Sequence, residues 1–283
     1  MKTVHTIADL RQTLRAWRLA DERIGFVPTM GNLHAGHSSL IEAARQRCDR
    51  VVASIFVNPL QFGLNEDFEQ YPRTLEAAQV ELEARGADLL FAPANAEMYP
   101  DGTPETVVKV GAITDELCGA FRPGHFDGVS TVVNILFNLV QPDLAVFGIK
   151  DYQQFEVIRR MVADLKMPVE LVAAPIVRDA DGLAMSSRNQ YLGEADRARA
   201  AQLYAQLQSV AAAVRADFVS YPAACEAAMA ALREHGFEPQ YLELRAPDLS
   251  VPTPDGPWVL LAAAMLGGTR LIDNLQFDRS TAA

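Results

Sequence analysis

The sequence predicts an α/β protein in which a doubly wound parallel sheet is followed by a smaller α+β domain. Over the first two thirds of the chain, short β-branched runs alternate with helical patterns, which is typical of a parallel sheet covered by helices on both faces. The pattern changes after about Ile176, where two alanine-rich helical stretches precede three consecutive strand-like runs. We therefore expect a Rossmann-like domain over residues 1–176 and a smaller α+β domain over residues 177–283.

The first domain is expected to alternate strands and helices along its whole length. The apolar run IGFVP at 24–28 predicts a strand that leads through a glycine-containing turn into a helix at 36–47. The run VVASIFV at 51–57 predicts the next strand, and the spacing of Leu75, Ala78 and Leu82 predicts a helix at 73–85. The same alternation then predicts strands at 89–92, 144–147 and 169–177, and helices at 127–140 and 152–165.

The second domain is expected to begin with helices and to end with strands. Its alanine-rich stretches predict helices at 195–216 and 221–235, and its β-like runs predict strands at 240–245, 258–265 and 269–274. The intervening segment RDADGLAMSSRNQYL at 178–192 is polar and contains Gly182, as expected of a loop.

The composition excludes several classes of protein. The 283 residues include 25 lysines and arginines against 36 aspartates and glutamates, which gives a net charge of −11. Nucleic acids and anionic membranes require a basic face, so neither is an expected partner. The N-terminal stretch lacks a signal-peptide core, and no apolar run approaches the roughly 20 residues of a membrane helix, so we expect a cytoplasmic protein. Of the widely spaced Cys48, Cys118 and Cys225, the first and last are expected to be buried free thiols.

The strongest functional signal is PTMGNLHAGH at 28–37, where the first expected strand turns into a helix. Ligands of open α/β sheets bind outside the carboxyl ends of the strands, so this motif occupies the position of a binding site. Gly31 permits a tight turn, and Gly36 lets a ligand approach the backbone closely. A helix N-terminus favours phosphate, and His34 and His37 can donate hydrogen bonds to its oxygens as negative charge develops.

Other interpretations of this histidine pair remain open from the sequence alone. Two histidines three residues apart can belong to a metal site, although no third ligand stands in a compatible motif. Either ring can also cap the helix or fill a polar gap. The pair, the glycines and the strand–helix junction together favour phosphate binding.

The second signal is SIFVNPLQFGLNED at 54–67, just past the next strand. Amides at Asn58 and Gln61 offer uncharged donors and acceptors that suit a carboxylate, a hydroxyl or an amine. An Asn-Pro turn with incidental polar groups is the alternative. Because this segment and the histidine motif follow strands of the same sheet, we favour a role in substrate binding.

The third signal is FGIKDYQQ at 147–154, after the fourth expected strand. The chain has only four lysines, and Lys150, which follows Gly148 closely, is suited to act as a point charge on a phosphate. Asp151 can orient Lys150 or contact a ribose, and Gln154 lies one helical turn further on. The alternative is a surface Lys–Asp pair of little energetic weight.

Two further loops carry weaker signals. The segment MSSRN at 185–189 offers two hydroxyls and a guanidinium that suit closure over a polyphosphate, although a solvated linker has a similar composition. The segment from Arg122 to His125 precedes a core helix and is a fifth candidate. His5 and His235 have no supporting context, so we expect surface or structural roles for them.

Together these motifs resemble a known family. The His-x-Gly-His turn ending at His37 and the MSSRN loop resemble the paired signatures of the HIGH-type nucleotidylyltransferase superfamily. The strings PTMGNLHAGH, SIFVNPLQFGLNEDFEQYPRT, RPGHFDGVSTVV, FGIKDYQQ and MSSRN resemble the pantothenate synthetase family, in order and over nearly the whole chain. Asn32, Leu64 and Ile149 depart from the residues most frequent in that family, which are alanine, proline and glutamate.

The resemblance implies an ATP-dependent ligase that condenses pantoate with β-alanine through pantoyl adenylate and releases AMP and pyrophosphate. It also implies Mg²⁺, which offsets charge on the departing pyrophosphate, and a cytoplasmic homodimer whose smaller domain acts as a lid. No carboxylate ligand for Mg²⁺ is assigned from the sequence. The enzyme would work mainly by positioning and charge stabilisation.

The resemblance also implies roles for individual residues. The catalytic candidates are His34, His37 as proton donor, and Lys150 on the phosphates. The full set implied to bind ATP is Met30, Gly31, Asn32, Leu33, His34, Ala35, Gly36, His37, Gly148, Ile149, Lys150, Asp151, Val177, Met185, Ser186, Ser187 and Arg188.

Three amides are implied to bind the other substrates. Gln61 would hold pantoate and then β-alanine, Gln154 would hold pantoate, and Asn58 would add a polar contact. A nucleotidylyltransferase that acts on a phosphorylated acceptor would instead need a basic acceptor pocket, which these neutral amides do not supply. A non-catalytic ATP-binding regulator would tolerate the loss of His37 or Lys150, and both are present. The ligase is therefore the expected function.

Overall fold

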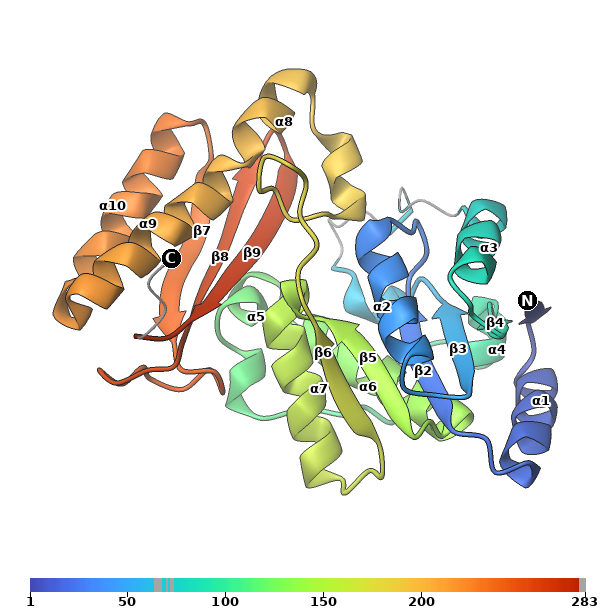
Figure 1. Cartoon of the computed structure of the whole chain (residues 1–283). Coiled ribbons are helices and arrows are strands. Elements are labelled where there is room, and N and C mark those ends of the chain that lie inside the picture. The colour runs from blue at the N-terminus through green and yellow to red at the C-terminus, as the bar shows by residue number, and fades with distance from the viewer. Residues whose placement is uncertain (64–67, 70, 72–73, 280–283) are drawn as a thin grey trace. The chain divides into compact units, whose positions relative to one another are not determined.

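A computed structural model describes residues 1–63, 68, 69, 71 and 74–279 (Figure 1). The first part of the chain forms a parallel sheet of six strands in the order β1-β4-β3-β2-β5-β6. The order reverses direction between the neighbouring strands β2 and β5, which is where open α/β sheets bind their ligands. The strands are β1 (Lys2–Val4), β2 (Ile24–Thr29), β3 (Arg50–Ile55), β4 (Leu89–Phe91), β5 (Leu144–Gly148) and β6 (Glu170–Ala174).

Helices connect these strands and cover both faces of the sheet. Helices α2 and α3 contribute to one cluster of buried residues that includes Ile41 of α2 and Val27 of β2. On the opposite face, Phe137 of α6 makes edge-on contacts with Phe26 and Phe147, with ring centroids 6.4 and 6.3 Å apart. The helices are α1 (Ile7–Leu19), α2 (Ala35–Arg45), α3 (Leu75–Ala84), α4 (Asn95–Met98), α5 (Cys118–Phe121), α6 (His125–Val140) and α7 (Tyr152–Asp164), with 3₁₀ turns η1 (Pro59–Gln61), η2 (Ala112–Thr114) and η3 (Ile149–Asp151).

The C-terminal part packs two helices against an antiparallel sheet of three strands in the order β7-β8-β9. Trp258, at the start of β8, is only 1% exposed and stacks on Phe218 with ring centroids 5.8 Å apart. The elements are η4 (Ser187–Tyr191), α8 (Glu194–Ala200), α9 (Gln202–Ala216), η5 (Phe218–Ser220), α10 (Tyr221–Glu234), β7 (Glu238–Arg245), β8 (Trp258–Leu266) and β9 (Thr269–Phe277). The predicted α/β fold with a smaller α+β part is thus confirmed.

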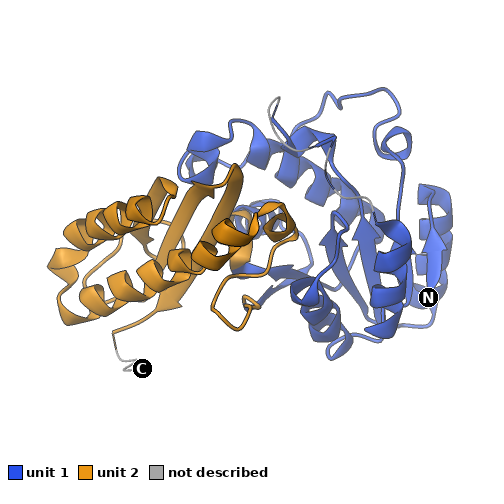
Figure 2. Ribbon diagram, turned by 90° about the horizontal axis from the view of Figure 1, so that it is seen from above, with its two compact units in different colours: residues 1–149, 157–175 blue, residues 150–156, 176–283 orange. Residues whose placement is uncertain are grey.

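The chain divides into two compact units (Figure 2). The first unit comprises residues 1–149 and 157–175, and the second comprises residues 150–156 and 176–283. The short segment that carries Lys150 and Gln154 therefore groups with the C-terminal residues, whereas the sequence pattern predicts that it belongs to the first domain. No described helix is long and apolar enough to cross a membrane.

Several elements differ in detail from those predicted. Strand β1 and helix α1 were not predicted. Helix α1 nevertheless begins with a regular N-cap, since the side chain of Thr6 accepts a hydrogen bond from the N–H of Asp9. The helix predicted at 195–216 is two helices that meet at Ala201. Alanine is the best helix former, so the sequence gives no sign that a helix ends there. Leu64 and the predicted helix start at Arg73 lie outside the described residues. All three cysteines are free and buried, as predicted for Cys48 and Cys225.

A buried ion pair between Arg178 and Asp273 fastens the segment that follows residue 176 to strand β9. Arg178 donates to the two carboxylate oxygens of Asp273 at 2.6 and 2.9 Å, and its guanidinium lies 3.6 Å from the ring centroid of Tyr204. The side chain of Asp273 is only 1% exposed. Burial raises the pKa of Asp273, and the hydrogen bonds from Arg178 oppose that rise. Removing one partner would leave the other without its counter-charge in a buried place.

Replacing Asp273 should therefore destabilise the protein far more than replacing an exposed aspartate. Asp273→Asn removes the counter-charge of Arg178, and breaking a buried pair costs about 3 kcal/mol or more. Asp255 faces Arg279 at 3.8 Å with its side chain 92% exposed, so Asp255→Asn is the matched control and should cost less than about 1 kcal/mol. Differential scanning calorimetry measures both variants, and equal melting temperatures would contradict the anchoring role of the ion pair.

Candidate active site

Strand β2 passes into helix α2 through a turn with a left-handed backbone. Gly31 has a φ of 90° and Asn32 a φ of 49°, a conformation open to glycine and tolerated by asparagine better than by most residues. Thr29 closes the turn, because its hydroxyl donates to the carbonyl of Ser54 at 2.8 Å and accepts from the N–H of Gly31 at 3.2 Å. Asparagine at position 32, where the family more often has alanine, thus suits the local backbone.

The two histidines of the motif cap helix α2 reciprocally. His34 is the N-cap residue, and its Nδ1 accepts from the N–H of Gly36 at 3.1 Å. The Nδ1 of His37 accepts from the N–H of His34 at 3.4 Å, and the two ring centroids are 4.2 Å apart. The sequence left capping and phosphate binding as alternatives, and the geometry shows that both rings do serve as caps.

The cap also determines which ring nitrogen carries the proton. A nitrogen that accepts a hydrogen bond carries no hydrogen, so the neutral rings of His34 and His37 hold their proton on Nε2. Each ring therefore has a donor on the side opposite the capped backbone. The first N–H groups of α2 add partial positive charge at the same place. Two such donors at a helix N-terminus suit a phosphate that gains negative charge.

The side chain of Asn58 is the centre of a buried hydrogen-bond network beside η1. Its Oδ1 accepts from the N–H of Leu60 at 3.3 Å and from the hydroxyl of Tyr99 at 2.9 Å. Its Nδ2 donates to Oε1 of Gln61 and to the carbonyl of Gly128, both at 3.1 Å. An asparagine amide has two acceptor and two donor positions, and all four are used inside the protein. Asn58 is 1% exposed, and its amide is hydrogen-bonded inside the protein, in part to Gln61. Its direct contact with substrate stays a prediction.

The backbone carbonyl of Gln61 is held by the loop that precedes α6. Nδ1 of His125 lies 2.8 Å from this oxygen, and Nη2 of Arg122 donates to it at 3.3 Å. Nη1 of Arg122 lies 2.9 Å from Nε2 of His125. Since a carbonyl only accepts and a guanidinium only donates, His125 is neutral with its proton on Nδ1. The weak fifth candidate of the sequence therefore has a specific role, which is to fix the backbone next to a predicted substrate ligand.

Helix α6 approaches η1 so closely that only glycine fits at position 128. A Cβ on Gly128 would lie 2.3 Å from the carbonyl oxygen of Leu60 and 2.7 Å from the backbone nitrogen of Gln61. Contacts below 3.0 Å to backbone atoms require the chain to move. The position of Gln61 thus depends on the absence of a side chain at Gly128 in helix α6.

In the second unit, Lys150 lies in the 3₁₀ turn η3, two residues after the last residue of β5. Its Nζ lies 3.7 Å from a carboxylate oxygen of Asp151, and its side chain is 20% exposed. The side-chain amide of Asn274 in β9 donates to the backbone carbonyl of Lys150 at 3.0 Å. Gln154 lies on the first turn of α7 and is half-buried. Neighbouring residues of β9, Asp273 and Asn274, therefore fasten two segments of the second unit that carry predicted ATP ligands.

The predicted ATP segments at Val177 and at Met185 are joined by a tight turn. The N–H of Met185 donates to the carbonyl of Val177 at 2.9 Å, so the two residues lie opposite each other. The hydroxyl of Ser186 caps η4 by accepting from the N–H of Arg188 at 3.3 Å. The MSSRN loop therefore leads into the 3₁₀ turn η4, for which Ser186 is the cap.

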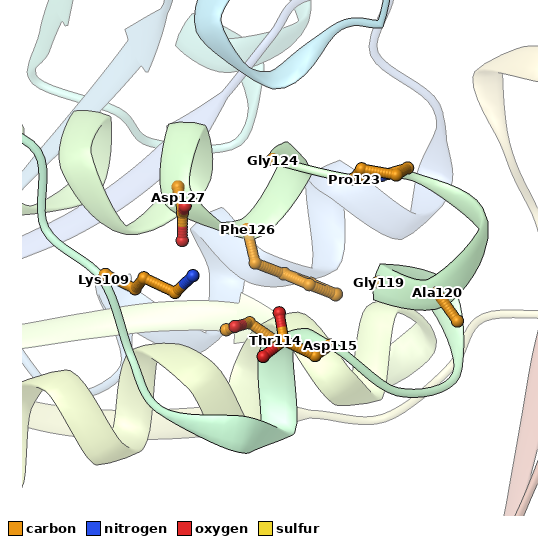
Figure 3. A pocket seen from close by; sticks show the side chains of 9 residues that line it. All are labelled: Lys109, Thr114, Asp115, Gly119, Ala120, Pro123, Gly124, Phe126 and Asp127. Atoms are coloured by element: carbon orange, nitrogen blue, oxygen red, sulfur yellow. The ribbon is translucent and has the colours of Figure 1, made fainter.

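Two cavities adjoin these elements in the first unit. One, of about 340 Å³, reaches the β2–α2 turn and is lined by Met30, Gly31, Ile55, Phe56, Val57, Thr74, Leu75, Ala92, Pro93, Ala94 and Asn95. The other, of about 370 Å³, lies beside the first turn of α6 (Figure 3). Figure 3 shows Lys109 and Asp127 extending into this hollow, which is also lined by Pro123 and Gly124 of the fifth candidate segment. Its mixed charges do not define one class of ligand.

The structure distributes the predicted residues over both units. The first unit holds Met30 to His37, Asn58, Gln61, Gly148 and Ile149, and the second holds Lys150, Asp151, Gln154, Val177 and Met185 to Arg188. Tyr99, Gly128, Arg178, Asp273 and Asn274 also shape these surroundings and were not predicted. A single tyrosine or glycine carries no pattern, whereas the polar loop that begins at Arg178 offered a weak signal.

The comparisons with known proteins identify the family. A family model described as pantoate-beta-alanine ligase matches residues 2–276. The chain belongs to the pantoate-β-alanine ligase family. A pantothenate synthetase from Shewanella amazonensis is 56% identical over 282 residues, which cover 99% of this chain and 100% of that relative.

Solved structures of this ligase family agree with the fold. The crystal structure of pantothenate synthetase from Thermus thermophilus has a TM-score of 0.90 and 48% identity, covering 98% of this chain and 99% of that chain. Pantoate-beta-alanine ligase from Francisella tularensis, complexed with beta-gamma ATP and β-alanine, has a TM-score of 0.83 and 32% identity, covering 100% of this chain and 99% of that one. Both similarities extend over residues of both units.

Gly128→Ala should displace η1 from α6 and lower the stability of the first unit. Forcing an extra methyl group into packed surroundings costs about 1–3 kcal/mol. Gly193→Ala is the matched control, because Gly193 has an ordinary φ of −64° and no heavy atom lies within 4 Å of its added Cβ. Thermal unfolding and amide hydrogen exchange at 58–61 measure the effect. Unchanged exchange in a stable Gly128→Ala variant would contradict the close approach.

Proposed function

We propose that the protein catalyses the ATP-dependent condensation of pantoate with β-alanine to pantothenate, with release of AMP and pyrophosphate. The observation that carries the proposal is the match to the ligase family over residues 2–276, together with its histidine motif at the N-terminus of α2. A relative with 32% identity was crystallised with an ATP compound and β-alanine. Both ligands are substrates of the proposed reaction.

The proposed reaction has two steps. A carboxylate oxygen of pantoate attacks the α-phosphorus of ATP, the bond from that phosphorus to the bridging oxygen breaks, and pyrophosphate leaves with the electron pair. The resulting pantoyl adenylate is a mixed anhydride with a good leaving group. The amine of β-alanine then attacks the acyl carbon, an amine proton is lost, and AMP departs. Both steps build up charge on phosphate oxygens, which fixed donors stabilise.

The proposed phosphate donors are His34, His37 and Lys150. The capped rings hold Nε2–H donors in fixed positions, so they need no rearrangement as the charge develops. Lys150 contributes a full positive charge, and the residues from Met185 to Arg188 contribute two hydroxyls and a guanidinium. Gly148, Ile149, Asp151 and Val177 stay in the proposed nucleotide-binding set.

The proposed ligands of the other substrates are Gln61 and Gln154. A neutral amide can donate to the carboxylate or hydroxyl of pantoate without neutralising the charge that makes the carboxylate a nucleophile. Gln61 would then meet the amine of β-alanine in the second step. Its side chain is already held by Asn58, which favours positioning of the reacting groups.

Mg²⁺ is part of the proposal only as a companion of ATP. Among the described residues there is no group of three or more histidines, cysteines, aspartates and glutamates placed to hold a metal ion. Mg²⁺ commonly binds substrate phosphates and water with few protein ligands, and it neutralises phosphate charge when bound. A cytoplasmic homodimer with the second unit as a lid is likewise proposed from the family resemblance.

One assay tests the function directly. Purified protein is incubated with ATP, Mg²⁺, pantoate and β-alanine, and AMP, pyrophosphate and pantothenate are quantified. AMP and pantothenate should form in equal amounts and only when both organic substrates are present. AMP formation that ignores β-alanine, or a product that retains the adenylyl group, would refute the ligase reaction.

The two roles of His34 can be separated with a second capping residue. Asparagine is among the best N-cap residues, so His34→Asn should keep the melting temperature within about 2 °C while removing the Nε2 donor. His34→Ala loses the cap as well and should be destabilised by about 1 kcal/mol. Loss of one such donor typically lowers kcat about 100-fold or more. We expect both variants to show that loss in the ligase assay, and full activity of a stable His34→Asn variant would contradict the phosphate role.

A further inference from the structure

The orientation of the Asn58 amide is fixed by two backbone groups. The N–H of Leu60 can only donate, so the atom it meets at 3.3 Å must be the amide oxygen. The carbonyl of Gly128 can only accept, so the atom it meets at 3.1 Å must be the amide nitrogen. Turning the amide over would break both hydrogen bonds inside the protein. Backbone geometry therefore determines which way Asn58 points.

The orientation of Asn58 in turn determines that of Gln61. The second hydrogen of Nδ2 in Asn58 meets Gln61 at 3.1 Å, so the atom there must be the acceptor Oε1. Nε2 of Gln61 then lies on the other side of the amide, 3.2 Å from the sulfur of Met30. A thioether is a weak acceptor, which a stronger oxygen acceptor can replace. Gln61 thus offers N–H donors next to a residue of the proposed ATP-binding set.

Tyr99 completes this network from the far side of Asn58. Its hydroxyl donates to Oδ1 of Asn58 at 2.9 Å, which fills the second acceptor position of that oxygen. The tyrosine is 8% exposed, and its ring packs edge-on against Phe56 with centroids 5.8 Å apart. Burial also raises the pKa of Tyr99, so the hydroxyl stays protonated and remains a donor at any working pH.

We propose that Tyr99 is a positioning residue that acts through Asn58 to hold the Gln61 amide with its N–H groups toward the substrate oxygen. Tyr99 itself does not touch substrate. Without its hydroxyl, Oδ1 of Asn58 keeps only the longer of its two bonds, and the amide that orients Gln61 is held less firmly. This inference rests on the proposed function, because it takes pantoate as the ligand of Gln61.

The test is Tyr99→Phe, which removes only the hydroxyl and keeps the ring against Phe56. Loss of one hydrogen bond in a buried network should raise the KM and the Kd for pantoate about fivefold while the KM for ATP stays within about twofold. Tyr241→Phe, at a tyrosine of β7 that is 7% exposed, is the matched control and should change neither constant. A purely structural effect of Tyr99→Phe would move the constants for both substrates together and would overturn the proposal.

Coupling to Gln61 supplies a second readout. If Tyr99 acts through Gln61, then Tyr99→Phe in a Gln61→Ala background should change the Kd for pantoate, measured by calorimetry, less than about 1.5-fold. A fivefold effect in both backgrounds would show that the two residues act independently, which refutes the relay. Where Gln61→Ala abolishes measurable binding, the selectivity of Tyr99→Phe for pantoate over ATP decides the question.

The same experiments separate this inference from the proposed function. A wild-type protein that binds no pantoate and forms no pantothenate overturns both. A fully active wild type with an unchanged Tyr99→Phe variant overturns only the positioning role. Selective weakening of pantoate binding, absent from the Tyr241→Phe control, is the outcome that supports it.

Discussion

Helix α2 begins with the same two side chains that the proposed chemistry requires. His34 and His37 use their Nδ1 atoms to accept N–H groups at the start of the helix. This leaves the opposite nitrogens to carry protons, so structural and chemical demands fall on different atoms of the same rings. Neither ring can turn over without uncapping the helix. The donors are thus fixed by folding itself, which is the condition under which charge stabilisation is most effective.

Around η1, the first unit achieves the same rigidity with neutral groups. Asn58 fills all four of its hydrogen-bonding positions, and His125 is held neutral between a carbonyl and a guanidinium. A charged group at the place of Asn58 would have to be desolvated and paired. Neutral amides avoid that cost, and their separate donor and acceptor atoms still fix the orientation of the side chains they contact. The second unit uses charged groups instead, because an ion pair between Arg178 and the buried Asp273 fastens the segment after residue 176 to strand β9.

Sequence patterns predicted the parts of this molecule that have a period or a motif. Alternating strands and helices predicted the parallel sheet, and the glycines and histidines at 31–37 predicted the turn from strand to helix at which a phosphate site is proposed. They did not predict the network at Asn58, because its partners Tyr99 and Gly128 are far apart in the sequence and no pattern pairs either of them with Asn58. Gly128 in particular looks like an unfavourable helix residue until the backbone of Leu60 is placed 2.3 Å from where its Cβ would be. For Asn58 itself, a polar side chain in a loop does not show from the sequence whether its partners are internal, so its internal hydrogen bonds were not predicted.

The net charge of −11 is compatible with anionic substrates because an ion responds mainly to charges nearby. Electrostatic effects at exposed sites fade over about 8–10 Å at ordinary salt concentrations. Several acidic side chains are paired on the surface, such as Glu170 with Arg23 and Glu22 with Arg50, both at 2.7 Å. The candidate phosphate donors instead lie at the start of α2 and after β5, where backbone N–H groups, imidazoles and Lys150 provide the field. The overall acidity therefore disfavours polyanions that cover a large surface, while a small phosphate ester senses only the donors at the strand ends.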